Sequence, residues 1–169
     1  MENESTEAEP YKDLDLRIFI GSSYDTKVTV TFALGDKKEI MLTKNSIHTV
    51  MVPSYHESKK SEKIERNLVE IVSEFPITVY AYSTIFRSSD SYACIPLENW
   101  GTEYSVISLP NDQYNPVKYD SVNRVIPRCS EFMVMGGYDS TVVTITPRAF
   151  TKGLKQEGNT YAVTLNKGE

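Results

Sequence analysis

The sequence predicts an all-β protein, an antiparallel β-sandwich, because branched and aromatic residues dominate its composition. It contains 15 Val, 12 Ile and 15 Thr, together 42 of 169 residues, with 11 Tyr and 6 Phe. Leu and Ala, which favour helices, number only nine and six. Branched and aromatic side chains fit the pleated, half-buried surface of a sheet. A chain of this length buries about 70% of its unfolded surface on folding, so it needs neither a disulfide nor a metal to be stable.

The predicted strands follow one another at the spacing of roughly 8–12 residues that is typical of sandwiches and barrels. In several of them apolar and hydroxyl side chains alternate, as in Val28-Thr29-Val30, which predicts one buried and one exposed face. Turn residues such as Gly35-Asp36 separate the segments. The predicted strands are 16–20, 28–32, 39–42, 47–52, 77–82, 104–109, 131–135, 142–146 and 160–165.

The segment 57–75 fits two structures. Its apolar residues are spaced as on one face of a helix, and the intervening charges of both signs suit a solvated helix face. The alternative is a polar loop over 54–66 and a strand over 68–73, with Val69 and Ile71 on one face. The pattern alone slightly favours the helix. The apolar residues are Ile64, Leu68, Ile71, Val72 and Phe75.

A faint internal repeat relates the two halves of the chain. The segment 16–31 reads LRIFIGSSYDTKVTVT, and 130–146 reads SEFMVMGGYDSTVVTIT. Each copy places a strand, a Tyr-Asp turn and a Thr/Val strand in the same order. The turn residues bond their own backbone in any hairpin, so the pattern is explained either by two similar half-repeats or by the general likeness of hairpins.

The two ends of the chain differ in character. Residues 1–12 are predicted to be a disordered acidic tail, since four of the first ten residues are Glu and no apolar signal-peptide core is present. The β domain is expected over 13–169. Its last strand, 160–165, is followed by turn residues that ordinarily lead into a partner strand, so the sequence is expected to be a fragment of a longer domain.

The charge of the chain argues against two classes of partner. Eighteen Lys and Arg against 23 Asp and Glu give a net charge of −5, with no basic stripe. Phosphate binding begins from clustered positive charge, so we expect no nucleic-acid partner and no attraction to anionic membranes. The apolar runs are too short for a transmembrane helix, so we expect no membrane insertion.

No constellation of residues predicts catalysis, a metal site or a cofactor. His48 and His56 lack further ligands at the spacing of a zinc site. There is no Gly-x-Ser-x-Gly motif and no glycine-rich nucleotide fingerprint. Glu98, Glu103 and Glu131 would have to meet in a cleft to hydrolyse a glycoside, and nothing in their spacing indicates this.

Cys94 and Cys129 are the only cysteines. A disulfide between them would close a loop of about 35 residues and stabilise the fold by a few kcal/mol. Cys94 lies in an apolar stretch, where a buried free thiol is equally natural, so both states remain open.

Trp100 is the only tryptophan, and Tyr104 follows it closely near a predicted turn. Such a pair could form a platform on which a sugar ring stacks. Aromatic residues more often serve as buried apolar surface with a satisfied polar tip.

Several stretches in a fixed order resemble the N-terminal domain family of IgGFc-binding protein. No single stretch is specific, but their order and spacing fit the family from about residue 14 onward. They are FPITVY at 75–80, SSDSY at 88–92, IPL at 95–97, GTEY at 101–104, SEF at 130–132, DSTVVTITP at 139–147 and VTLNKGE at 163–169.

The resemblance implies an all-β, secreted, non-enzymatic binding module that continues beyond residue 169, and it favours the strand interpretation of 68–73. The chain departs from the family in lacking a signal peptide and in its charged insert at 57–66. We carry no Fc-contact residue over from the family to this chain.

The sequence therefore predicts a non-catalytic, extracellular module that recognises protein or glycan partners, as in mucus or adhesive proteins. Scaffolded loops at one end of a sandwich usually carry such binding, here 88–92 and 99–104. Two alternatives are a carbohydrate-binding or carbohydrate-active sandwich and a structural spacer within a larger array. The candidate binding residues are Ser89, Asp90, Tyr92, Trp100 and Tyr104.

Overall fold

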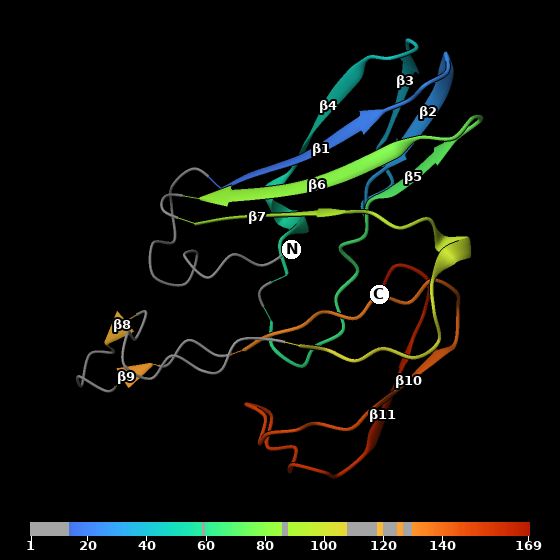
Figure 1. Ribbon diagram of the computed structural model, residues 1–169. Helices are drawn as coiled ribbons and strands as arrows, with labels where there is room; N and C mark the ends of the chain where they lie inside the picture. Colours follow the sequence, from blue (N-terminus) through green and yellow to red (C-terminus); the bar gives the residue numbers. More distant parts are fainter. Residues whose placement is uncertain (1–13, 59, 86–87, 108–117, 120–124, 127–129) are drawn as a thin grey trace.

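The computed structural model describes residues 14–58, 60–85, 88–107, 118–119, 125–126 and 130–169 (Figure 1). The predicted tail at 1–12 lies outside these residues. The described part contains only two helices, both single 3-10 turns, η1 (Ser54–His56) and η2 (Leu97–Asn99), and neither is long and apolar enough to cross a membrane. The strands are β1 (Asp15–Gly21), β2 (Thr26–Thr31), β3 (Lys37–Leu42), β4 (Ile47–Val52), β5 (Glu70–Ser73), β6 (Thr78–Ile85), β7 (Ser88–Ala93), β8 (Lys118–Tyr119), β9 (Val125–Ile126), β10 (Thr141–Ile145) and β11 (Tyr161–Leu165).

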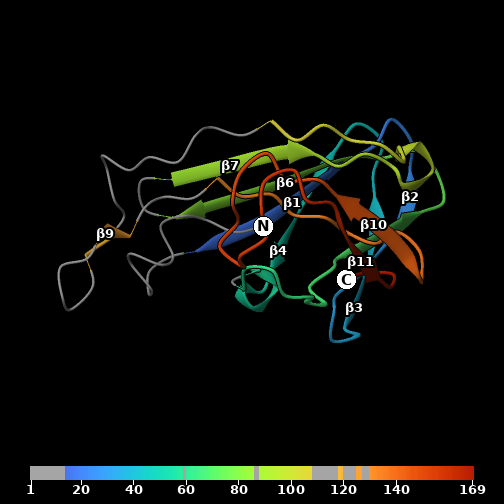
Figure 2. The same cartoon turned by 90° about the horizontal axis from the view of Figure 1, so that it is seen from below.

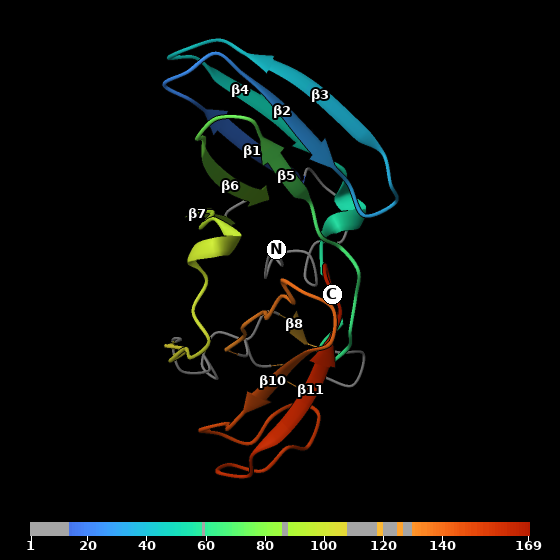
Figure 3. The same cartoon turned by 90° about the vertical axis from the view of Figure 1, so that its right-hand side faces the viewer.

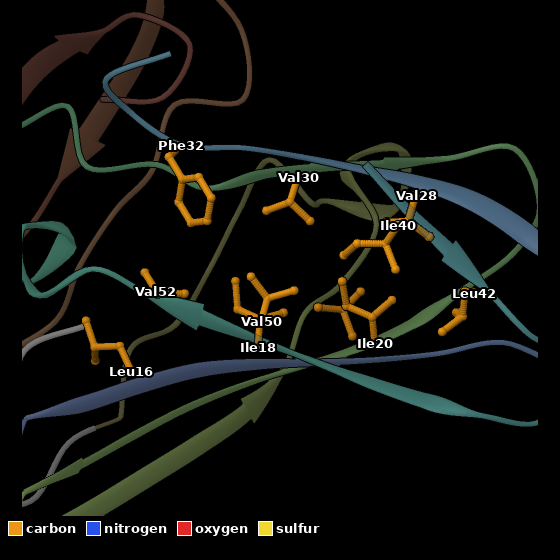
Figure 4. Close-up of a cluster of buried hydrophobic side chains, with 11 residues drawn as sticks. Leu16, Ile18, Ile20, Val28, Val30, Phe32, Ile40, Leu42, Val50 and Val52 are labelled. Carbon is orange, nitrogen blue, oxygen red and sulfur yellow. The ribbon is translucent and has the colours of Figure 1, made fainter. Parts of the chain in front are cut away.

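The prediction of an all-β antiparallel fold is confirmed. One sheet has the order β4-β1-β6-β7, which Figure 2 shows side by side, and a second has the order β3-β2-β5. Every pairing within them is antiparallel. The two sheets enclose the main apolar core, in which side chains from both layers face one another (Figure 4). We call this part, 14–93, the first half.

The alternation in the sequence determines which side chains enter this core. In β1, Leu16, Ile18 and Ile20 are buried while the residues between them are half-exposed. In β2, Val28 and Val30 are 0% exposed and the intervening threonines face outward. This period of two is what the pleat of a strand requires, and it fixes the register of both strands.

The remaining described chain, 94–169, which we call the second half, contains the antiparallel hairpin of β10 and β11. Figure 3 shows the hairpin at the opposite end of the molecule from β3 and β4. Contacts near 62–70 join the halves. The Nζ atom of Lys167 lies 2.5 Å from Oε1 of Glu70, and Oε1 of Glu62 accepts hydrogen bonds from the Thr151 hydroxyl and from the amide of Gly153.

The slight preference for a helix over 57–75 is wrong. The described residues form irregular chain followed by β5, which pairs with β2 through registers such as Thr29↔Val72. Glu62 has a left-handed φ of 54°, which a right-handed helix does not allow. The alternative of a loop and a strand is confirmed, although the strand covers four residues. Val69 and Ile71 pack against the core as that alternative predicted.

Two further strand predictions are wrong. The described part of 104–109, residues 104–107, is irregular, and so is 131–135. Both segments have strand-like sequences, but a strand needs a hydrogen-bonded neighbour, and in the described residues no strand pairs with either. Conversely, 88–92 was expected to be a loop and forms most of β7, an edge strand paired with β6.

Candidate functional site

Trp100 is held in a fixed position by the short helix that precedes it. Pro96 caps η2, and the amide of Trp100 donates to the carbonyl of Leu97 at 3.2 Å. The indole Nε1–H donates to the carbonyl of Ile95 at 2.9 Å. With its polar group satisfied, the ring remains 38% exposed, so Trp100 presents apolar surface to solvent from a defined orientation.

The Trp100 ring packs against a turn that is distant in sequence. A Cβ added to Gly137 would lie 3.2 Å from Cζ3 of Trp100 and 2.5 Å from Cδ1 of Leu97. A Cβ on Gly136 would lie 2.6 Å from the backbone oxygen of Asn166. The pair of glycines thus lets η2, the 136–140 turn and the turn after β11 approach one another closely.

Two exposed tyrosines are close in the chain to the residues of this contact. The ring of Tyr104 folds back over Gly101, where an added Cβ would lie 3.7 Å from both Cζ and the hydroxyl oxygen. Tyr138 directly follows Gly137. The exposed fractions of Tyr104 and Tyr138 are 70% and 66%. We call Trp100, Tyr104 and Tyr138 the aromatic ledge.

Hydrogen bonds hold the turn that carries Tyr138. The hydroxyl of Thr141 donates to the carbonyl of Tyr138 at 2.6 Å. The Asp139 carboxylate accepts from the amide of Lys167 at 3.0 Å, and the side-chain oxygen of Asn166 accepts from the amide of Ser140 at 3.3 Å. These bonds pre-organise the ledge, which lowers the entropy cost of binding a partner.

The charges on and near the ledge are of both signs. The segments 88–107 and 130–146 contain five acidic residues and no Lys or Arg. The turn after β11 adds the Lys167 ammonium within electrostatic range of Asp139. The acidic residues are Asp90, Glu98, Glu103, Glu131 and Asp139.

The structure does not bring all five predicted binding residues together. Trp100 and Tyr104 are close neighbours on the ledge. Ser89 and Asp90 are exposed on β7, at the end of that strand away from η2 (Figure 1). Tyr92 is half-exposed near the other end of β7. Desolvation, with a smaller contribution from Cys94, raises the pKa of the Tyr92 phenol.

Cys94 lies directly after β7 and is an exposed free cysteine in the structure. Nearby atoms partly desolvate its sulfur, which raises the pKa of the thiol, while a backbone hydrogen bond with Ala81 lowers it by less. Cys129 lies outside the described residues, so a bond between the two cysteines stays a prediction.

The histidines do not contribute to a site. His48 is exposed on β4. His56 is buried in η1, where its ring packs against Phe32 and Tyr55 and its Nδ1 lies 2.9 Å from the carbonyl oxygen of Asn67. Within the part of the chain that the structure describes, no three His, Cys, Asp or Glu residues gather as a metal site would need.

Sequence reasoning missed Tyr138 and the role of Gly137. The available signal was the glycine pair directly before an aromatic residue, because adjacent glycines in a turn often mark the close approach of another group. The pattern does not reveal which group approaches. That group is Trp100, 37 positions earlier in the chain.

Comparison with known proteins finds one matching family model. The family model described as IgGFc binding protein matches residues 90–169, slightly less than half of the chain, and confirms the predicted resemblance. The match includes the whole aromatic ledge and the β10–β11 hairpin. No curated protein and no solved structure matches the chain.

Proposed function

We propose that this chain is a non-catalytic, extracellular binding module that holds a protein partner on the aromatic ledge. The observation that carries the proposal is the packing of Trp100 against Gly137, with the exposed Tyr104 and Tyr138 close to these two residues in the chain, within the segment that the IgGFc-binding family model matches. The binding partner in the family's name makes the Fc part of immunoglobulin G the first partner to test.

The composition of the ledge suits a protein partner. Tryptophan and tyrosine contribute much of the binding energy at protein interfaces, because they bury large apolar areas and lose little side-chain entropy. The ledge exposes three such rings without an intervening basic residue. The carboxylates of Glu98 and Glu103, which are close in the chain to Trp100 and Tyr104, favour an epitope that includes Lys or Arg.

A glycan is the second candidate, because the exposed part of the Trp100 ring offers a stacking surface for a sugar. Tyr104 and Tyr138 could extend this surface. Binding of a basic protein epitope to the carboxylates near the ledge should weaken as salt is added, whereas binding of an uncharged glycan should not. Measuring binding at low and at high salt therefore separates the two candidates.

The experiment is a binding measurement of the purified chain against immobilised immunoglobulin G Fc and, in parallel, mucin glycans. We expect binding to Fc that Trp100→Ala and Tyr138→Ala each weaken by roughly tenfold or more, the effect of losing a central aromatic contact. The matched control is Tyr24→Ala. Tyr24 is 52% exposed, precedes an aspartate as Tyr138 does, and stacks on Phe75 away from the ledge.

Three outcomes count against the proposal. Equal losses for Tyr24→Ala and Tyr138→Ala would show that the ledge is not the contact surface. Binding to mucin glycans alone would replace the protein partner with a sugar. The absence of binding to either probe at about 100 μM, a weak affinity for an interface of standard size, would favour the structural spacer.

A further inference from the structure

The loop that connects β10 to β11 is much longer than the loop that connects β2 to β3. The two hairpins pair in matching register, counted from Thr26↔Leu42 and from Thr141↔Leu165. Their loops differ, because residues 32–36 join the first pair of strands and 146–160 join the second (Figure 1). Loops of about 15 residues without helix or strand are uncommon in compact domains, and those that are ordered usually have a function.

Hydrogen bonds within the long loop give it a defined shape. The amide of Gly158 donates to the carbonyl of Pro147 at 2.9 Å, which closes the base of the loop. The amide of Thr151 donates to the carbonyl of Lys155 at 3.0 Å, and the amide of Lys155 donates to the hydroxyl oxygen of Thr151 at 3.1 Å. These bonds fold residues 151–155 into a compact turn.

A carboxylate from the first half occupies this turn. One oxygen of Glu62, Oε1, accepts hydrogen bonds from the Thr151 hydroxyl at 2.5 Å and from the Gly153 amide at 3.0 Å. A Cβ added to Gly153 would lie 1.7 Å from the other oxygen, Oε2, so the carboxylate rests directly on the glycine backbone. The turn therefore directs two donors at one carboxylate, and hydrogen bonds to an ionised acceptor are the strong ones.

The charges at the turn suit an anion. The loop 146–160 has three basic residues and one acidic residue, so positive charge remains in excess when the Glu62 carboxylate is added. Nζ of Lys155 lies 5.0 Å from the centre of the Tyr161 ring, at the base of the loop. Desolvation raises the pKa of the Tyr161 phenol, and the nearby Glu62 carboxylate raises it further. The charged residues of the loop are Arg148, Lys152, Lys155 and Glu157.

The contact is made between two strained segments of backbone. Glu62 has a left-handed φ of 54°, and Leu154, within the turn, has a φ of 67°. This conformation is disfavoured for residues with a Cβ, and most of all for bulky ones such as leucine. Strain of this kind persists where the surrounding contacts impose it. A carboxylate from another molecule would occupy the turn without straining residue 62.

We propose that the 151–155 turn is a binding site for the side-chain carboxylate of an Asp or Glu on a protein partner, and that Glu62 occupies it in the free chain. A protein carboxylate is the favoured ligand because the occupant is itself a glutamate in an irregular segment. The site is separate from the aromatic ledge, since Tyr138 precedes β10 and the turn follows β10 at the other end of the hairpin.

The tether sets the competition between Glu62 and an external carboxylate. A group attached through a short flexible linker has an effective concentration in roughly the millimolar range. A free carboxylate must therefore reach millimolar concentrations, or bring further contacts, before it displaces Glu62. Removing the Glu62 carboxylate removes this competitor, so an external carboxylate should bind the Glu62→Ala chain more tightly than the parent chain.

The test measures binding of a peptide of residues 60–66, KSEKIER, to the full chain carrying Glu62→Ala. Binding is followed through the NMR signal of the Gly153 amide, which donates to the carboxylate. We expect the peptide to shift this signal with roughly millimolar affinity, and to bind the parent chain at least about fivefold more weakly. A control peptide with Glu62→Gln keeps the shape but loses the charge, and it should also bind at least about fivefold more weakly.

Two further substitutions, each added to Glu62→Ala, locate the site. Gly153→Ala should abolish peptide binding, because its Cβ would take the place of the carboxylate, and the three atoms closest to that Cβ all belong to the truncated Glu62 side chain. Gly21→Ala is the matched control, since its Cβ would meet other atoms only at 3.6 Å or more, and it should change binding less than twofold. Circular dichroism checks that both variants fold. Equal binding by the two variants, or by the two peptides, overturns the proposal.

Three other outcomes also overturn it. If Glu62→Ala leaves the Gly153 amide signal of the parent chain where it is, the carboxylate does not occupy the turn. If N-acetylneuraminic acid binds the Glu62→Ala chain more tightly than the peptide does, the ligand is an acidic sugar. If neither probe binds while Glu62→Ala lowers the melting temperature, the contact only ties the two halves together. Binding of Fc by the aromatic ledge is measured separately, so the proposed function survives all three.

Discussion

Equivalent valines in the two hairpins should differ in their contribution to stability. Val28 is 0% exposed in the closed core of the first half, and its counterpart Val143 is half-buried on the open face of β10. Val28 pairs with Ile40 two residues after Thr26↔Leu42, and Val143 pairs with Val163 two residues after Thr141↔Leu165. The substitutions Val28→Ala and Val143→Ala therefore remove the same two carbon atoms from matching positions in the two hairpins. They differ only in what covers the side chain.

The magnitude follows from burial. Removing two fully buried carbons costs about 1.6 kcal/mol in transfer free energy, at roughly 0.8 kcal/mol each. A sealed cavity of roughly 50 Å³ adds about 1.2 kcal/mol, so Val28→Ala should lower the free energy of unfolding by about 2.8 kcal/mol. For Val143→Ala, half of the transfer term and no sealed cavity give about 0.8 kcal/mol.

The assay is urea unfolding of both variants and of the parent chain, followed by far-UV circular dichroism at the same protein concentration. We expect the midpoint to fall clearly more for Val28→Ala, with similar slopes. Equal costs would refute the reasoning, because they would mean that the inner face of the β10–β11 hairpin is as completely covered as the first-half core.

Three other substitutions and conditions test separate parts of the structure. Gly136→Ala should lower the melting temperature more than Gly35→Ala, because the added Cβ would lie 2.6 Å from the Asn166 carbonyl oxygen, a backbone atom that cannot move aside. Ala at position 35 is disfavoured only by the left-handed φ of that residue. Similar shifts in melting temperature would show that the turns do not approach so closely. Lys167→Met should remove the hydrogen-bonded ion pair with Glu70, which raises the pKa of the Lys167 ammonium. The stability difference from the parent chain should therefore be present at neutral pH, diminish with added salt, and disappear as pH rises through the pKa of the ammonium. A stability difference unaffected by pH would assign the loss to packing. Desolvation raises the pKa values of Cys94 and Tyr92 in the folded chain, so the folded state holds these protons more tightly than the unfolded state does. The urea midpoint should therefore fall as pH rises from neutral to about pH 10, and it should fall less in the Cys94→Ser, Tyr92→Phe double variant. An equal fall in the double variant would contradict the assignment.

The strands that the sequence predicts correctly are those whose alternating residues find an antiparallel partner strand. The bounds of β4 are those expected, and β2, β3, β10 and β11 differ only at their ends. β7 was missed because SSDSYA has no apolar alternation, and only its pairing with the edge of β6 makes it a strand. The segment 131–135 fails in the opposite way, since an apolar sequence alone does not supply a hydrogen-bonded neighbour.

The candidate site was half predictable for a related reason. Trp100 and Tyr104 are noticeable in the sequence as aromatic residues near a turn. Tyr138 joins them only because Gly136 and Gly137 allow two turns to touch, a contact between positions far apart in the chain. Local patterns report the residue types that suit a binding surface, whereas the surface itself is assembled by long-range packing.

The most direct test of the binding surface is oxidative footprinting of the chain with and without bound immunoglobulin G Fc. Trp100, Tyr138, Met41 and Met51 are all exposed and readily oxidised, and the two methionines lie on β3 and β4, away from η2 (Figure 3). We expect Fc to protect Trp100 and Tyr138 while leaving the oxidation of Met41 and Met51 unchanged. Protection of the methionines with an unprotected Trp100 would contradict the claim that the aromatic ledge holds the partner.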